Sequence, residues 1–530
     1  MKRRFIIILA VIFLNSAWLG GGGCAPYAAP TQTEEAQTIP TPESAAPGQD
    51  QHPPGDTGLA AGTQPDEIAA PPQPLSHNEY EVRLEYDPVE RVITGVEKIT
   101  FANRTGAALN QVYVMNYFNA FAEDYTPAPY FEEMEDKLFA RGVDYGYCNI
   151  LNASINSDEA EITTDGVAVE LSAQNPVAEG EQCVVLLQFE AYIPELNART
   201  GGNGQETWFG NFLPILAAHD SEGWHKDPYY PAGDPFYSEI SNYTVSVSAP
   251  ANYTVAGTGP LTVTEMDNKR TTTFNARLVR DFAFAIGSRY TLTTAVTQHG
   301  TEVQLYSFSP EINRESLLTT AIKSLEYYNT VIGSYPYEEL KIVEAGLYTN
   351  GMEYPGIIFM DSDYLKRTSD FRSVAHEIGH QWFYNVVGNN QTRDAWLDEG
   401  LTMLIQEGVF YDRNGIDLRM REDYEILASK RVSAGKSMDD PLGEFGSWSE
   451  YYDTHYTKGK LMAYALMLKM GDEKFYEFIK RFYSEYSFKI ADKEAFIETA
   501  EAVYGEKLTS FFDAWFGLPL PPLEDTAGGR

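Results

Sequence analysis

The chain has 530 residues, 43% of them hydrophobic, which is enough for two or three domains around a substantial core. Its 76 acidic and 39 basic residues give a formal net charge of -37. A field of that sign repels polyanions, so the composition argues against nucleic acid and against anionic lipid surfaces as partners.

The first 24 residues have the features of an export signal. Basic residues occupy positions 2–4, an apolar run covers positions 5–14, and a glycine-rich stretch ends at Cys24. The apolar run is too short to predict a membrane-spanning helix. A cysteine just after such a run resembles a bacterial lipoprotein signal, in which Cys24 is lipidated and becomes the mature N-terminus, although Gly21 occupies the position where Leu is usual. The alternative is an ordinary secretory signal that is cleaved nearby.

Residues 25–76 are rich in Pro, Ala, Thr, Gln, Gly and Glu and contain almost no large apolar side chains. Such a composition cannot bury a core, so we predict a disordered, flexible tether. Signal and tether together predict an exported protein that is lipid-anchored to the outer face of a bacterial membrane, or secreted if Cys24 is not lipidated. The lipid anchor is the only membrane contact that we expect.

Between residues 77 and 295, apolar and polar residues alternate in short runs bounded by turn residues, which is the pattern of half-buried strands. The six clearest runs are Tyr80–Tyr86, Val92–Phe101, Val167–Leu171, Cys183–Phe189, Tyr243–Val247 and Tyr290–Val296. We therefore predict an antiparallel, β-rich N-terminal domain over residues 77–295.

Two features of this predicted domain have more than one interpretation. Cys148 and Cys183 could pair in an exported protein or stay as free, buried thiols, because two cysteines without known geometry do not define a bridge. Residues 227–237 are rich in Pro and aromatic side chains, and could line a substrate cleft or form a rigid structural loop. We assign neither cysteine a catalytic role.

From about residue 296 the hydrophobic pattern changes to a mixture of strands and helices. Strands are predicted at Val303–Phe308 and Ile357–Met360, with a helix at Glu315–Ile332 between them. The last four helices are predicted at Gly459–Met470, Glu473–Tyr486, Lys493–Val503 and Leu508–Trp515. The chain is therefore predicted to be a multidomain α+β protein whose second domain covers residues 296–525.

The pattern His-Glu-x-x-His lies at residues 376–380 in a helical stretch. At about 100° per residue, His376, Glu377 and His380 share one arc of the helix, and apolar residues occupy the opposite arc. Two imidazoles one turn apart can bind a single zinc ion, and the carboxylate between them is left to act on water. Glu399, nineteen residues after His380, lies in a second helical pattern and supplies a third ligand. The sequence therefore predicts one Zn2+ ion, and the alternative is a pair of buried, hydrogen-bonded histidines.

Two further motifs accompany the zinc motif. Residues 351–354 read Gly-Met-Glu-Tyr, and residues 456–459 read Tyr-Thr-Lys-Gly. In this order the three motifs resemble the gluzincin metallo-aminopeptidases of the aminopeptidase N family. The first of these two motifs resembles the family's Gly-Ala-Met-Glu-Asn exopeptidase motif, with Tyr354 in place of Asn, and the second resembles the segment that holds its catalytic tyrosine. The resemblance covers most of residues 77–516 and is strongest over residues 351–460.

The resemblance implies a thermolysin-like zinc catalytic domain over residues 296–525. We expect this domain to end in a short helical C-terminus, in place of the large C-terminal helical domain that is common in the family.

The resemblance also implies roles for particular residues. Glu377 would be the general base, and Tyr456 would donate its phenolic hydrogen to the oxyanion. Glu353, together with Gly351 and Met352, would bind the α-amine of the substrate. The family also uses a polar residue of the N-terminal domain at this amine, which the sequence does not locate.

The implied activity is zinc-dependent removal of N-terminal residues from peptides outside the cytoplasm, and the implied partners are peptides with a free N-terminus. Two alternatives remain open. A gluzincin endopeptidase would share the zinc site but lack an anchor for the free amine, so Glu353 is the residue that distinguishes the two. An inactive zinc-binding scaffold is the other alternative, and the presence of Glu377 and Tyr456 argues against it.

Overall fold

The computed structural model describes residues 77–430 and 436–523. The predicted export signal, Cys24 and the predicted tether lie outside these residues. All described residues belong to one compact unit, Pro72–Arg530. Within them, no helix combines the length and the apolar character needed to cross a membrane.

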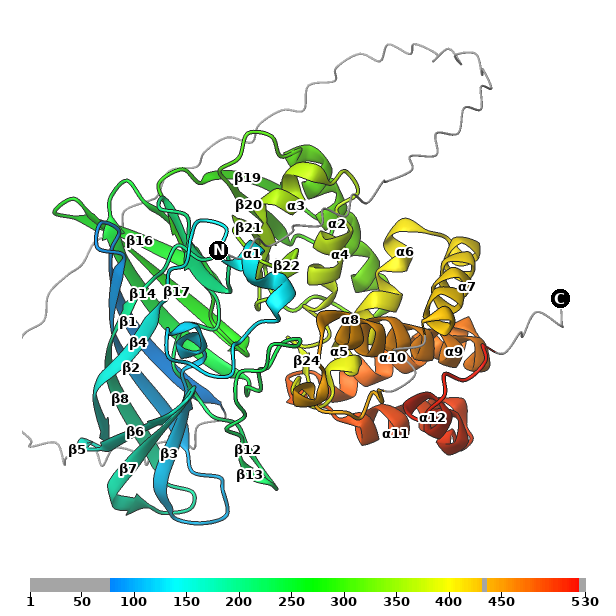
Figure 1. Ribbon diagram of the computed structural model, residues 1–530, viewed down its shortest axis with the longest axis horizontal. Coiled ribbons are helices and arrows are strands. Elements are labelled where there is room, and N and C mark those ends of the chain that lie inside the picture. The colour runs from blue at the N-terminus through cyan, green and yellow to red at the C-terminus, as the bar shows by residue number, and fades with distance from the viewer. Residues whose placement is uncertain (1–76, 431–435, 524–530) are drawn as a thin grey trace, which may run out of the picture. The chain divides into compact units, whose positions relative to one another are not determined.

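Strands dominate the first part of the described chain (Figure 1). An eight-stranded sheet has the strand order β16-β17-β14-β1-β2-β8-β4-β5. Its strands are β1 (Asn78–Asp87), β2 (Val92–Ala102), β4 (Tyr147–Ile155), β5 (Asp158–Glu159), β8 (Gln182–Tyr192), β14 (Ser241–Pro250), β16 (Leu261–Met266) and β17 (Lys269–Val279). Alternate residues of β1, from Tyr80 to Tyr86, are buried, so one face of the sheet covers a core.

Smaller sheets complete the β-rich region. One has the order β11-β3-β7-β6, another β15-β18-β10-β9, and β12 pairs with β13. These strands are β3 (Leu109–Met115), β6 (Glu161–Asp165), β7 (Ala168–Val177), β9 (Thr200–Gly202), β10 (Glu206–Phe209), β11 (Ile215–Leu216), β12 (His219–Asp220), β13 (Gly223–Trp224), β15 (Thr254–Gly257) and β18 (Phe284–Gly287). A short helix, α1 (Glu135–Leu138), lies between β3 and β4 in the sequence.

The predicted β-rich region is confirmed, and all six predicted strands are present. Five of them lie in this region, whereas the sixth, Thr291–Val296, pairs with Glu302–Ser307 in the sheet of the second part of the chain. Pairing in the large sheet is antiparallel with one difference, because β1 and β14 run parallel. These two strands are far apart in the sequence, so no hairpin forces them into opposite directions. Cys148 and Cys183 are both buried and free, which answers the question that the sequence left open.

The second part of the chain combines a five-stranded sheet with helices. The sheet has the order β19-β20-β21-β23-β22. Its strands are β19 (Thr291–Val296), β20 (Glu302–Ser307), β21 (Glu339–Ala345), β22 (Gly351–Met352) and β23 (Ile357–Asp361), and β24 (Val387–Gly388) pairs with β25 (Lys489–Ile490) elsewhere. The helices are α2 (Arg314–Val331), α3 (Ser362–Arg367), α4 (Arg372–Gly379), α5 (Ala395–Ile405), α6 (Glu407–Phe410), α7 (Arg413–Ser429), α8 (Trp448–Tyr451), α9 (Gly459–Met470), α10 (Asp472–Tyr486), α11 (Lys493–Tyr504) and α12 (Thr509–Phe516).

The inner strands β21 and β23 of the five-stranded sheet are buried on both faces. Ile357 and Phe359 of β23 belong to the core shared with the β-rich region, whereas Ile358 and Met360 belong to the core under the helices. Because side chains alternate along a strand, one short apolar run can serve two cores. The edge strand β22, which begins the 351–354 motif, therefore lies where the β-rich region and the helices meet.

Arg280 joins the two parts of the chain directly. Its buried guanidinium donates to the carbonyls of Ser238 in the β-rich region and of Tyr384, Asn385 and Lys489 in the helical region. Tyr384 and Asn385 follow the predicted zinc-site helix closely. The β-rich region therefore fixes the chain on the C-terminal side of that helix.

Candidate active site

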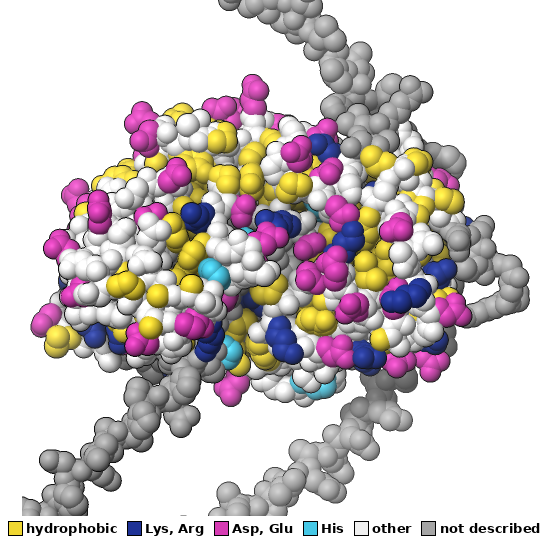
Figure 2. Space-filling view, turned by 90° about the horizontal axis from the view of Figure 1, so that it is seen from below, with side chains coloured by type: hydrophobic (Ala, Val, Ile, Leu, Met, Phe, Trp, Pro, Cys, Tyr) yellow, Lys and Arg dark blue, Asp and Glu magenta, His cyan; other side chains and the backbone are white. Residues whose placement is uncertain are grey.

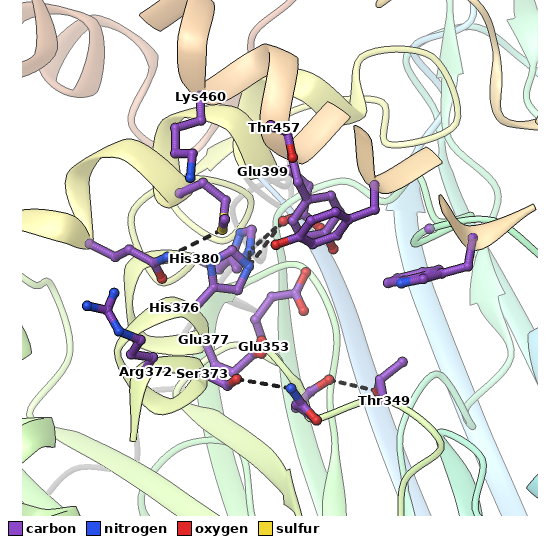
Figure 3. A pocket seen from close by; sticks show the side chains of 18 of the residues that line it. Thr349, Glu353, Arg372, Ser373, His376, Glu377, His380, Glu399, Thr457 and Lys460 are labelled. Carbon is purple, nitrogen blue, oxygen red and sulfur yellow. Dashed lines mark hydrogen bonds and ion pairs between the residues drawn. The ribbon is translucent and has the colours of Figure 1, made fainter. Parts of the chain in front are cut away.

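Helices α4 and α5 bring the three predicted metal ligands together (Figure 3). His376 lies in α4, His380 follows at its C-cap with helical backbone angles, and Glu399 lies in α5. Glu399 Oε2 lies 3.2 Å from His376 Nε2 and 3.3 Å from His380 Nε2, and the two imidazole nitrogens are 3.1 Å apart. Tetrahedral zinc with bonds of about 2.0–2.1 Å separates its donors by about 3.3 Å, so these atoms fit one zinc ion.

The surroundings of the cluster favour metal binding. His380 Nδ1 lies 3.2 Å from the carbonyl of Phe383, to which it can donate, and this leaves Nε2 free to face the cluster. Burial alone would raise the pKa of Glu399, but the imidazoles of His380 and His376 lower it to about 2. The third ligand is therefore ionised at neutral pH.

Glu377 lies beside the cluster and is buried. Burial raises its pKa to about 8, although the charge of His380 acts in the opposite direction. Gly351 packs directly against it, and a Cβ atom on Gly351 would lie 2.5 Å from Glu377 Oε1. The glycine of the 351–354 motif therefore leaves room for the carboxylate, which gives it a packing role that the sequence did not reveal.

Tyr456 reaches the cluster from a π-helical turn, Tyr452–Lys458, that precedes α9. Its hydroxyl donates to Glu399 Oε1, and its ring lies 5.8 Å from the ring of His376. The phenolic hydrogen is therefore within reach of a group bound at the cluster.

Glu353 is buried, so it is not a solvent-facing loop residue. Figure 3 shows its carboxylate next to Glu377, on the same side of the His376, His380 and Glu399 cluster. Its Oε1 atom accepts no hydrogen bond from the described residues. Burial raises the pKa of Glu353, as expected for a carboxylate held away from water without a partner.

These residues line a cavity of about 460 Å3 that receives side chains from both parts of the chain. Acidic side chains are frequent on the molecular face that Figure 2 shows. From the β-rich region the cavity is lined by Arg199, Gly233 and Asp234. Arg199 is buried and lies 2.6 Å from Asp234, and it also donates to the hydroxyl of Tyr229 and the carbonyl of Gly233. Burial raises the pKa of Asp234, while the guanidinium of Arg199 opposes that change.

The cavity distinguishes between the two interpretations of residues 227–237, and its lining includes residues that the sequence did not predict. The 227–237 segment lines the cavity through Gly233 and Asp234, so the cleft interpretation is the better one. The Pro and aromatic content of that segment was the only signal for Asp234. No sequence signal indicated Arg199, because its role depends on packing against a distant segment. Met352, predicted at the site, also lines the cavity, and its sulfur contacts Arg199.

Comparison with known proteins connects this geometry to a family. Residues 317–515 match the model of the Peptidase family M1 domain. This chain carries an M1 peptidase domain. The matched segment contains the predicted zinc ligands, Glu353 and Tyr456, and the resemblance to the aminopeptidase N family is confirmed at the level of the family.

Relatives of the M1 domain are distant in sequence. Aminopeptidase M1-D of Oryza sativa subsp. japonica is 24% identical over 42% of this chain, and aminopeptidase A of Gloydius brevicauda is 22% identical over 58%. The matched parts cover 27% and 35% of these two proteins, so this chain spans about a third of their length or less.

The M1 zinc metallopeptidase from Deinococcus radiodurans has a similar structure, with a TM-score of 0.62. The similarity covers 85% of this chain and 96% of that one, at 19% sequence identity. A bound form of that protein carries a Tyr-Ser-Ala substrate. At this identity the similarity shows the fold, which is the predicted β-rich region followed by a catalytic region that ends in helices.

Proposed function

We propose that this protein is a zinc-dependent aminopeptidase that removes N-terminal residues from peptides outside the cytoplasm. One observation carries the proposal: a buried carboxylate with an unpaired oxygen, Glu353, lies in the same cavity as the His376, His380 and Glu399 cluster. The α-amine of a peptide has a pKa near 8 and is largely an ammonium group at neutral pH. A buried carboxylate can bind that group by a charge-assisted hydrogen bond. Binding of the ammonium limits how far the peptide enters, so only its first peptide bond reaches the metal.

The metal cluster supplies the reactive centre. When bound to His376, His380 and Glu399, a zinc ion acts as a Lewis acid that polarises the scissile carbonyl and lowers the pKa of water. Glu377, beside these ligands, accepts the proton of the attacking water and returns a proton to the leaving nitrogen. Burial raises the pKa of this carboxylate, which strengthens it as a base and brings its pKa near the pH at which it must both accept and release a proton.

Two other residues complete the proposed mechanism. Tyr456 donates its phenolic hydrogen to the oxyanion that develops on the carbonyl, a contribution of about 3 kcal/mol for a preorganised donor. Asp234, held by its ion pair with Arg199, places a second acidic side chain in the part of the cavity near Glu353. We assign Asp234 to the polar residue of the β-rich region that helps to hold the amine.

Hydrolysis of a panel of amino-acyl amides, with metal analysis of the same sample, tests the proposed activity. We expect about one zinc per chain, loss of hydrolysis after chelation and recovery when zinc is restored. Hydrolysis that survives complete metal removal would overturn the proposal. A zinc-loaded protein that hydrolyses no amide or peptide would support the inactive scaffold instead.

We also propose that the protein is exported and lipid-anchored through Cys24. The proposal is supported by the order of segments before this cysteine, which is a basic segment, an apolar run and a glycine-rich stretch. Wild-type protein expressed in a bacterium should fractionate with membranes and carry an acyl group at its N-terminus, and Cys24→Ser should prevent this lipidation. Soluble wild-type protein without an acyl group would favour a secretory signal.

A further inference from the structure

We propose that Tyr354 positions Glu353 for binding of the substrate amine, by a hydrogen bond to Asn211 of the β-rich region. This inference rests on the proposed function and deepens it. Tyr354 departs from the family pattern, in which Asn is usual at this position. Glu353 lines the cavity, whereas Tyr354 is buried in the core that the β-rich region shares with the five-stranded sheet.

A short chain of hydrogen bonds begins at the Tyr354 hydroxyl. It donates to Asn211 Oδ1 at 2.9 Å, and Asn211 Nδ2 donates to Asp281 Oδ2 at 2.8 Å. Asp281 Oδ1 in turn accepts from the amide of Phe282 at 2.7 Å. Tyr354, Asn211 and Asp281 are all buried, so water does not compete for these bonds.

The backbone at Glu353 and Tyr354 also receives hydrogen bonds from the helical region. The carbonyl of Glu353 accepts from Asn385 Nδ2 at 2.9 Å, and the carbonyl of Tyr354 accepts from Gln381 Nε2 at 3.1 Å. These two donors follow the zinc-site helix. The backbone at residues 353 and 354 is therefore held by donors from the helical region. The β-rich region holds the same segment through the side chain of Tyr354.

The backbone around Asn211 fits the tyrosine. Asn211 has a φ of +50°, in the left-handed region that Asn tolerates better than most residues. Gly210, just before it, faces the Tyr354 hydroxyl, and a Cβ atom there would overlap that hydroxyl. The amide of Gly210 donates to the carbonyl of Arg199 at 3.0 Å. The paired strands β9 and β10 are thus flanked by Arg199, which holds Asp234, and by Asn211, which holds Tyr354.

This arrangement explains how both acids of the amine site can keep their positions without a ligand. Glu353 and Asp234 line one cavity, and the Asp234 carboxylate raises the pKa of Glu353 further, so the two acids repel when both are ionised and need other contacts to stay in place. Arg199 restrains Asp234 by an ion pair. Tyr354 restrains the backbone of Glu353 by a neutral bond, which leaves the Glu353 carboxylate free for the substrate.

The test compares Tyr354→Phe with Tyr290→Phe. Tyr290 is also buried and donates its hydroxyl to a backbone carbonyl, that of Glu344 at 2.9 Å, so it controls for the loss of a buried tyrosine hydroxyl. The readout is the ratio of kcat/KM for a peptide with a free N-terminus to kcat/KM for its N-acetylated form. We expect Tyr354→Phe to lower this ratio about tenfold, mainly through KM, as for the loss of one buried hydrogen bond. Tyr290→Phe should leave the ratio unchanged.

Two further variants separate positioning from general destabilisation. Asn211→Gly removes the partner of Tyr354 while allowing the same backbone angles, so it should lower the ratio as Tyr354→Phe does. In a Glu353→Ala background, Tyr354→Phe should cause no further loss, because there is no carboxylate left to position. Equal ratios in Tyr354→Phe and Tyr290→Phe would overturn the inference, as would full additivity with Glu353→Ala. A wild type that does not prefer the free peptide would instead overturn the proposed function.

Discussion

Glu377 is the residue whose loss should separate chemistry from metal binding. It lies beside the ligands but is not one of them, so Glu377→Gln should keep the zinc ion and lower turnover by about 10²–10⁴-fold. His380→Ala removes a ligand and should lose both zinc and turnover. Measuring metal content and hydrolysis rate on the same samples distinguishes the roles of Glu377 and His380. Equal loss of metal in the two variants would contradict these roles.

Asp281 predicts a pH dependence of stability. Burial raises its pKa from an ordinary 3.8 to about 7, so in the folded state it keeps its proton at pH values where the unfolded chain releases it. Its contribution to stability is therefore complete below the unfolded pKa of 3.8 and is lost as the pH rises toward 7. Between these values the free energy of unfolding of the wild type should fall by up to about 1.4 kcal/mol per pH unit more than that of Asp281→Asn. Denaturant unfolding at several pH values measures both slopes, and parallel slopes would contradict the prediction.

The site residues differ in how far the sequence could predict them. His376, Glu377 and His380 follow helical spacing, so their common arc follows from the sequence alone. Glu399 lies on a separate helix, and it was predicted from the number of ligands that zinc needs and from its place in the next helical pattern. The Arg199 and Asp234 pair forms through the packing of distant segments, which no local pattern encodes.

At the scale of elements, the crossing of α5 and α9 sets the distance between Glu399, the proposed third metal ligand, and Tyr456, the proposed hydrogen donor. The two helices touch at Gly400, next to Glu399, and at Gly459, three residues after Tyr456. A Cβ atom on Gly400 would lie 2.8 Å from the carbonyl carbon of Gly459, whereas one on Gly459 would lie 3.1 Å from the Cα of Gly400. Glycine at both positions thus permits the close approach.

The contact between Gly400 and Gly459 predicts that alanine at these two positions lowers stability and zinc affinity to different extents. Gly400→Ala should lower the free energy of unfolding by about 1–3 kcal/mol and weaken zinc binding, because the helices must separate. Gly459→Ala should have the same effects to a smaller extent, since its nearest contact is less close. Thermal unfolding of the metal-free proteins and zinc titration measure the two effects. A larger effect of Gly459→Ala would show that the crossing is not what limits the site.

Helices α9 and α10 were both predicted to within one residue at each end, although only α10 has a regular apolar stripe, whereas α9 is buried nearly all round. The π-helical turn that carries Tyr456 could not be predicted, because its extra residue per turn depends on packing against α5 and not on the sequence pattern. The strands β9 and β10 are short and buried, so they show no alternation. The residues next to them nevertheless make both contacts that position the proposed amine site.

At the scale of the whole molecule, Arg280 should couple the β-rich region to the catalytic region. Burial lowers its pKa to about 10, so it stays charged while donating to four carbonyls of both regions. Arg280→Met should lower the free energy of unfolding by about 3 kcal/mol, because those carbonyls lose a charged donor. Arg280→Lys keeps the charge and should lose less. Denaturant unfolding measures the free energy of unfolding of both variants. Equal decreases in Arg280→Met and Arg280→Lys would mean that Arg280 stabilises the protein by packing and not by hydrogen bonding.

The packing between the two regions is what the sequence predicted least. The apolar run Ile357–Met360 indicated a strand, but the division of its side chains between two cores depends on the sheet that forms around it. The same packing brings the β-rich region to the cavity and completes the site. An amine site that needs both regions would not be recovered from the M1 domain segment alone.

In the proposed mechanism, the amine of the substrate fixes which bond is cleaved. The most direct test incubates the zinc-loaded protein with a short peptide and, separately, with its N-acetylated form, and follows the products by mass spectrometry over time. The free peptide should lose single residues in order from its N-terminus, and the acetylated peptide should be cleaved far more slowly. Cleavage at internal bonds, or equal consumption of the two peptides, would contradict the aminopeptidase proposal and favour an endopeptidase.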